Sequence, residues 1–188
     1  GRISMAEYYL MSQLPSLDGM GDHTPLPITE ERFSELCRRF LGKKAQRELD
    51  KLTLLPPRNE EKSSSPLIEA WNDGERKLRL ALGKVRADKM KKAFDTGNRY
   101  LPAGLMQAAR TAVELESPLE AEKFLNHYRL NFLETLRPMD AFSEDAVFYY
   151  GLKLKLLLRI RNFDAACGRT AYKNIYDSIM NGDRLEAE

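Results

Sequence analysis

The chain has 188 residues, of which 43% are hydrophobic and 31% are charged, and its formal net charge is +2. This length suits a single domain with its own core, and the apolar fraction is too high for an intrinsically disordered chain. The small net charge excludes binding to a polyanion through the charge of the whole chain, so any attraction to nucleic acid or to a membrane surface has to be local.

The N-terminal part of the chain divides into three segments. Residues 1–4 differ in character from the residues after them, and we expect them to be left over from an expression vector, with Met5 as the natural first residue. Residues 7–17 are apolar and aromatic, with Pro15 interrupting them, so a short buried strand and one or two helical turns are both compatible with the pattern. Residues 18–27 contain two glycines and two prolines and predict a loop.

Two short helices are expected next. Thr29 is a candidate N-cap, and apolar residues follow it at helical spacing as far as Gly42, where the first helix should end. A second helix is predicted over residues 43–54. Residues 56–66 have the composition of a loop, and we expect a flexible break there within a single helical domain that spans residues 5–188.

The middle of the chain predicts three helices. A long amphipathic helix is expected over residues 67–95, with Phe94 among the residues of its apolar side. A shorter helix is expected over residues 103–115. Ser117 is a candidate N-cap followed by proline, and this pair predicts the start of a third helix over residues 118–136.

Two more helices are predicted towards the C-terminus. The first runs from about residue 143 to residue 162 or 163 and is apolar nearly all round, so it should form the centre of the core. Leu156 and Leu157 should then both be buried, on different sides of this helix. Asp164 is expected to cap a last helix over residues 165–180. Altogether the sequence predicts an all-α fold, a bundle of six or seven helices joined by short loops.

Residue types that carry catalysis or bind metals are sparse. His23 lies in the glycine- and proline-rich loop, and His127 lies beside the apolar face of its helix, which favours a boundary residue over a ligand or a catalytic base. Cys37 shares a helical face with apolar residues, which favours a buried structural thiol. No motif of a phosphate-binding loop, a serine hydrolase, a zinc protease or a kinase occurs. We therefore predict no catalytic residue, no metal ligand and no cofactor.

Two features bear on the cellular compartment. Cys37 and Cys167 form no CxxC pair, and both fall inside predicted helices, which indicates free thiols in a reducing compartment. No apolar run approaches the ~20 residues that cross a bilayer, and no secretory signal peptide is visible. We therefore expect a cytoplasmic protein.

The strongest charge feature is residues 76–92, which we call the basic stripe. Eight basic residues against one acid, Asp88, give it a charge of +7, which leaves about −5 for the rest of a chain whose total is +2. The basic residues are Arg76, Lys77, Arg79, Lys84, Arg86, Lys89, Lys91 and Lys92. A solvated helix face, docking onto an acidic protein and nucleic-acid binding are all open, although aromatic residues that could stack on bases are scarce here. Arg76, Arg79, Arg86 and Lys89 are the predicted partner-binding residues.

Three groups of residues, in this order and spacing, resemble a known family. They are Tyr8-Tyr9-Leu10-Met11-Ser12 with Leu14-Pro15-Ser16-Leu17; Trp71 with residues 75–82 and 85–89; and residues 142–146 with Tyr150, Lys153, Leu154, Leu157, Arg159, Phe163 and Gly168. Together they resemble a family of bacterial proteins encoded beside the genes of V/A-type ATP synthases. That family is thought to stand in for the central-stalk cap, which is the C subunit of these enzymes and the d-type subunit of the eukaryotic ones. The resemblance spans the chain from Tyr8 to about Ile179.

The resemblance implies an all-helical, non-catalytic component or accessory protein of a bacterial V/A-type ATP synthase. Its implied partners are the central-stalk and proteolipid-ring subunits, which would place it at the cytoplasmic periphery of the inner membrane. Because the chain is much shorter than a cap of three helical lobes, a reduced or accessory form is as plausible as an equivalent of the whole cap. Two alternatives remain: an RNA-binding or general helical adaptor protein that uses the basic stripe, and an enzyme with a site around His127 and Tyr128.

Overall fold

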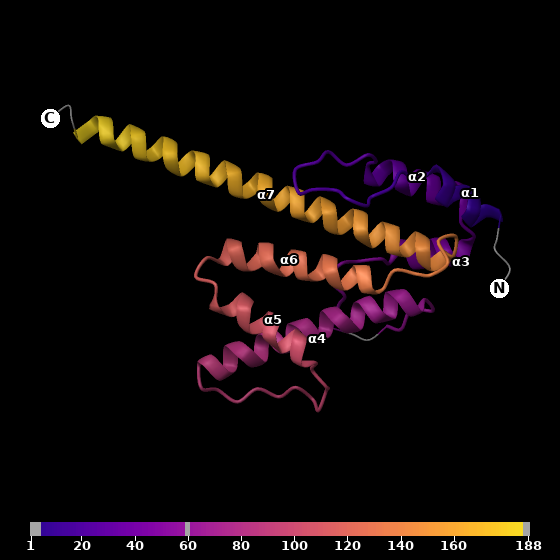
Figure 1. Ribbon diagram of the computed structural model, residues 1–188, viewed down its shortest axis with the longest axis horizontal. Helices are drawn as coiled ribbons and strands as arrows, with labels where there is room; N and C mark the ends of the chain where they lie inside the picture. Colours follow the sequence, from indigo (N-terminus) through magenta and orange to yellow (C-terminus); the bar gives the residue numbers. More distant parts are fainter. Residues whose placement is uncertain (1–4, 59–60, 186–188) are drawn as a thin grey trace.

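The computed structural model describes residues 5–58 and 61–185, and over these residues the chain forms seven α-helices and no β-strand (Figure 1). The helices are α1 (Met5–Gln13), α2 (Glu30–Phe40), α3 (Lys43–Asp50), α4 (Pro66–Lys89), α5 (Ala103–Glu114), α6 (Pro118–Thr135) and α7 (Glu144–Leu185). The predicted all-α bundle is therefore confirmed. The expected vector remnant at residues 1–4 lies outside the described residues, as do residues 59 and 60 of the predicted flexible break.

Local sequence accounts for where several helices begin. The side-chain hydroxyls of Thr29 and Ser117 accept hydrogen bonds from the backbone N–H groups of the third residue after them, at 3.1 and 3.4 Å. Both are the N-caps that the sequence predicts. Ser65 caps α4 in the same way and also donates a hydrogen bond to Asp145 at 2.6 Å, so the starts of α4 and α7 are joined. Each cap satisfies a backbone donor that the first helical turn leaves free.

The segment that the sequence left undecided, residues 7–17, begins as helix α1. Leu10 is fully buried in a cluster with residues of α2 and α7, which shows that tertiary packing selects the helix. Beyond α1, the hydroxyl of Tyr150 in α7 donates a hydrogen bond to the carbonyl of Pro15 at 2.7 Å. The N-terminal segment is therefore attached to the core at both ends.

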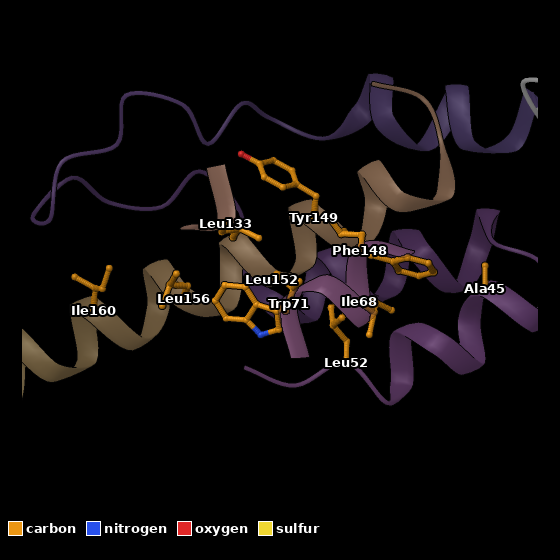
Figure 2. Packing of buried hydrophobic residues seen from close by; sticks show 11 residues of the cluster. Ala45, Leu52, Ile68, Trp71, Leu133, Phe148, Tyr149, Leu152, Leu156 and Ile160 are labelled. Carbon is orange, nitrogen blue, oxygen red and sulfur yellow. The ribbon is translucent and has the colours of Figure 1, made fainter. Parts of the chain in front are cut away.

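Helix α7 is the centre of the molecule. Figure 1 shows α1 and α2 on one side of it and α6, α5 and α4 on the other. Leu156 is fully buried in a cluster with residues of α3, α4 and α6, and Leu157, 3% exposed, is buried in a different cluster with residues of α1 and α2. In Figure 2 the indole of Trp71, from α4, lies in the first of these clusters together with Leu152 and Leu156. The predicted burial of this helix on opposite sides is confirmed.

The predicted break at Asp164 is wrong. Helix α7 continues without interruption from Glu144 to Leu185, and its C-terminal end extends beyond the ends of the other helices (Figure 1). The prediction relied on Asp164 as a capping residue, but aspartate inside a helix costs only a few tenths of a kcal/mol more than a good helix former (about 0.7 at most). No proline lies between Glu144 and Leu185 to interrupt the backbone.

The predicted length of the fourth helix also needs correction. Helix α4 ends at Lys89 and not near Asp95, and Lys91 adopts the left-handed conformation with φ 55°. The chain then turns back along α4, and Phe94 reaches Gly83 from outside the helix, where its ring would lie 2.5 Å from a Cβ atom at that position. The sequence placed Phe94 on the apolar side of this helix. In the structure Phe94 lies after the end of α4 and packs on it from outside.

Candidate functional site

The basic stripe lies on α4 and the residues that follow it. Its lysines are partly neutralised on their own helix, because Lys77 pairs with Asp73 at 2.7 Å and Lys84 pairs with Asp88 at 2.9 Å. Such exposed pairs one turn apart stabilise a helix by only about 0.3–0.5 kcal/mol. They leave the exposed cations that are not paired in this way, such as Arg79, Arg86 and Lys89, for contact with a partner.

Three of the four predicted partner-binding residues are exposed. Arg79, Arg86 and Lys89 form no salt bridge with any acid in the part of the chain that the structure describes. Arg79 and Arg86 are seven residues apart, so they lie on one face about 10 Å apart along the helix axis. Lys89 lies close to one turn beyond Arg86, at the last residue of α4. The helix thus presents three positive charges in a row.

The fourth predicted residue, Arg76, has a different environment. It is partly buried, and its Nε atom is inaccessible to solvent and has no hydrogen-bond partner among the described residues. An N–H donor that is buried without an acceptor costs about 1–3 kcal/mol. Because this Nε–H is buried, a ligand from another molecule would meet the terminal nitrogens of the Arg76 guanidinium group instead.

Arg76 and Arg79 line a groove of about 600 Å³ between α4 and the chain that turns back after it. We call this the arginine groove; its main lining residues are Arg58, Arg76, Arg79, Arg99, Leu80 and Phe94. The sequence predicted neither Arg58 nor Arg99 as site residues, because each lies far from Arg76 along the chain and outside the basic stripe. The one available signal was Gly83, since a glycine inside a helix often marks a close approach by another group.

A second charged cluster, also missed from the sequence, lies inside the bundle. Glu75 of α4 is 2% exposed and accepts a hydrogen bond from Nε of Arg129 in α6 at 2.7 Å. Arg129 also donates to Asn126 at 3.2 Å, and Arg159 of α7 donates to Glu122 of α6 at 2.7 Å. Burial raises the pKa of Glu75, although the nearby arginines act in the opposite direction. This network of hydrogen bonds joins α4, α6 and α7, and we interpret it as a structural link between these helices.

The other candidate residues occupy structural positions. His127 lies in the middle of α6 and is partly exposed, with Nδ1 2.8 Å from the carbonyl oxygen of Lys123 and Nε2 3.2 Å from a carboxylate oxygen of Asp22. Burial raises the pKa of its neighbour Tyr128, so that hydroxyl stays neutral. Cys37 is fully buried, which raises its thiol pKa to about 12 and confirms the predicted structural thiol. Cys37 and Cys167 are both free.

Neither a metal centre nor a membrane span is found within residues 5–58 and 61–185. No group of three or more histidine, cysteine, aspartate or glutamate residues in this part of the chain is placed to hold a metal ion. No helix within it has the length and apolar character that crossing a bilayer requires. Comparison of the chain with protein-family models, curated proteins and solved structures finds no match. A function is therefore argued from the sequence resemblance, its place in the fold and the charges on α4 and in the arginine groove.

Proposed function

We propose that this protein is a non-catalytic component or accessory protein of a bacterial V/A-type ATP synthase, a cap-like element between the central stalk and the membrane rotor. The observation that carries the proposal is the place of the three family-like groups of residues in the fold. They fall on α1 and the four residues 14–17 after it, on α4, and on α7 with the two residues before it, and both α1 and α4 pack against α7. The residues that resemble the family thus belong to one packed unit.

The burial of these residues supports the proposal further. Leu10, Trp71 and Leu154, one from each group, are all fully buried. Changes of volume at such core positions are costly, because the interior is closely packed. A family that shares these residues would therefore share the way in which the three helices pack. An all-helical body of this kind is also what the resemblance to the central-stalk cap implies.

The surface charge supports a role in docking. Arg79, Arg86 and Lys89 project from α4, while the chain outside the basic stripe carries about −5 of charge. Such a polarised molecule is steered by an acidic partner, and the charges set orientation and association rate more than affinity. A component that joins two larger subunits in a fixed orientation would use charge in this way.

The proposal is tested by affinity purification from the source bacterium. The protein is tagged at its chromosomal locus, and the material that co-purifies at about physiological salt is identified by mass spectrometry. We expect stalk or proteolipid-ring subunits of the V/A-type ATP synthase to be enriched over an untagged parent strain. Purification without any ATP synthase subunit would contradict the proposal.

Binding to RNA is the alternative outcome, and it has its own signature. If the basic stripe binds phosphates, retention on immobilised RNA falls steeply with salt, with a log–log slope of roughly −0.7 for each single-stranded phosphate contacted. We expect weak retention with a shallow slope. A steep slope together with the absence of ATP synthase subunits would replace the proposed function by RNA binding.

A further inference from the structure

The arginine groove is built from three separate parts of the chain. Arg76, Arg79 and Leu80 come from α4, Arg58 precedes that helix, and Phe94 belongs to the connection between α4 and α5. In Figure 1 this connection leaves the end of α4 and turns back, which brings residues 94–99 to the side of the helix. The groove therefore depends on the tertiary structure and is more specific than a charged helix face.

The floor of the groove is apolar. Phe94 packs on Gly83, where the absence of a side chain lets the ring approach the helix, and 38% of Phe94 is exposed. Leu80 lies one turn before Gly83 on the same face of α4 and also lines the groove. A purely ionic ligand would gain nothing from this floor, whereas a ligand with an apolar group beside its charge would bury both.

The walls of the groove are cationic. Arg76 and Arg79 of α4 line it together with Arg58 and Arg99 from the flanking segments, and Asp95 is the one acid that lines it among the described residues. One carboxylate oxygen of Asp95 already accepts a hydrogen bond from the N–H of Gly97 at 2.7 Å. The guanidinium group binds carboxylates in a planar, two-bond geometry, and the exposed Arg79 can offer both of these bonds to a ligand.

We propose that the arginine groove binds an acidic segment of a partner protein in which a carboxylate side chain lies next to an apolar one. The carboxylate binds between Arg76 and Arg79, and the apolar side chain lies on Leu80 and Phe94. A volume of about 600 Å³ accommodates a few side chains of such a segment. The identity of the partner rests on the proposed function, but the groove and its ligand chemistry do not.

A protein segment fits this groove better than a nucleic acid does. Bases bind to single-strand sites by stacking on exposed aromatic faces. Phe94 is the one aromatic ring that lines the groove among the described residues, and the edge of this ring is held against Gly83, so the groove has no second ring between which a base could stack. The apolar floor is therefore suited to an aliphatic or small aromatic side chain.

The proposal is tested with labelled ten-residue peptides and fluorescence anisotropy on the full chain. One peptide alternates aspartate with leucine, a second alternates aspartate with serine, and a third alternates lysine with leucine. We expect the aspartate–leucine peptide to bind most tightly, because it alone satisfies both the walls and the floor. Equal binding of the aspartate–serine peptide would overturn the role of the apolar floor, and binding of the lysine–leucine peptide would overturn that of the walls.

Charge variants locate the site. Arg79→Glu should weaken binding of the aspartate–leucine peptide by at least about tenfold, since it replaces a charge-assisted pair by a repulsion. Arg110→Glu is the matched control, because Arg110 is an exposed arginine of α5 outside the groove, and it should change the affinity by less than about twofold. Equal losses in the two variants would overturn the proposal, because they would indicate attraction to the net charge alone.

A variant that keeps every charge completes the test. Gly83→Ala places a methyl group where the Phe94 ring lies, and the exposed ring can swing away without disturbing the core. We expect the preference for the aspartate–leucine peptide over the aspartate–serine peptide to disappear, while a melting temperature no lower than that of wild type confirms the fold. If single-stranded RNA displaced the peptide with a steep salt dependence, the groove would be a nucleic-acid site.

The outcome for the groove is distinguishable from the outcome for the proposed function. Peptide binding that depends on Arg79, with no ATP synthase subunit in the affinity purification, would leave the groove intact and remove only the proposed partner. Enrichment of ATP synthase subunits that is unchanged in Arg79→Glu and Gly83→Ala would support the proposed function and overturn the groove as its docking site.

Discussion

Two glycines of α4 make contact with phenylalanine rings, but the two rings differ in their freedom to move. A Cβ atom at Gly74 would collide with Phe132, which packs against the core cluster around Trp71. A Cβ atom at Gly83 would meet Phe94, which is 38% exposed. The same substitution should therefore lower stability at Gly74 but not at Gly83.

We predict that Gly74→Ala destabilises the protein by about 1–2 kcal/mol, because overpacking against Phe132 outweighs the gain in helix propensity. Gly83→Ala should be neutral or stabilise by up to about 1 kcal/mol, since the propensity gain remains and Phe94 can move. Urea unfolding of the two variants beside wild type measures both effects. Destabilisation of similar size in both would show that Phe94 is held as firmly as Phe132.

The lowered pKa of the Asp18 carboxyl group leads us to predict that the stability of the protein depends on pH. Hydrogen bonds from Arg137 at 2.8 Å and from Lys153 at 2.9 Å lower the pKa of its carboxyl group from 3.8 to about 2. Because the pKa is lower in the folded state than in the unfolded state, the stabilisation is fully present above about pH 4 and is lost as the pH falls through about 2. The side chain is 51% exposed, and solvent screening holds this contribution to about 1 kcal/mol.

The variant Asp18→Asn isolates this carboxylate. We expect it to be less stable than wild type by about 1 kcal/mol at pH 7, and we expect the difference to shrink between pH 4 and pH 2. Lys153 keeps Glu134 as a partner at 2.8 Å, so the variant does not leave a buried charge unpaired. Urea midpoints measured for both proteins across this pH range provide the check, and a difference that does not change with pH would contradict the assignment.

At the scale of the elements, α4 and α6 are joined by a buried ion pair. The Nε atom of Arg129 lies 2.7 Å from the Oε1 atom of Glu75, and the two side chains are 9% and 2% exposed, respectively. Removing one partner of such a pair leaves the other charge buried and costs about 3–5 kcal/mol, whereas replacing both by apolar side chains of similar size is often nearly neutral. A change at Glu75 or Arg129 alone should therefore be poorly tolerated, although the pair as a whole adds little to the free energy of unfolding.

We predict that Arg129→Met destabilises the protein by about 3–5 kcal/mol and that adding Glu75→Met restores much of this loss. The physical reason is that Glu75 loses the cation that is hydrogen-bonded to it, while two methionines fill the space without charge. Thermal or urea unfolding of both single variants and the double variant forms a double-mutant cycle. Additive effects would show that the two side chains do not depend on each other.

At the scale of the whole molecule, positive charge is concentrated in the basic stripe, residues 76–92, which has a formal charge of +7. Reversing Arg79 and Arg86 together removes two cations that form no salt bridge with a described acid, so melting of the double variant should match wild type. Association with the partner should become slower and less dependent on salt, because electrostatic steering is lost. Stopped-flow association over a range of salt measures both, and an unchanged rate would exclude docking through this face. A lowered melting temperature would indicate that the stripe is paired within the molecule.

The residue pattern alone was enough to predict the helical class, several helix starts and the central role of α7. Helix starts depend on local hydrogen bonds, as at Thr29 and Ser117, and burial of α7 follows from apolar residues all around one helix. The predicted partner-binding residues Arg79, Arg86 and Lys89 were likewise found as charges along one helix, and their role in binding stays a prediction.

The remaining features depend on tertiary contacts. The end of α4 and the continuity of α7 rest on small local preferences that packing overrides, and the helix at α1 depends on the burial of Leu10. The arginine groove and the Glu75–Arg129 pair join residues far apart along the chain, and no periodicity in a single sequence encodes such a meeting. A polar side chain on a predicted helix looks the same whether it will face solvent or a buried partner, and only the packed neighbours distinguish Glu75 from the exposed acids around it.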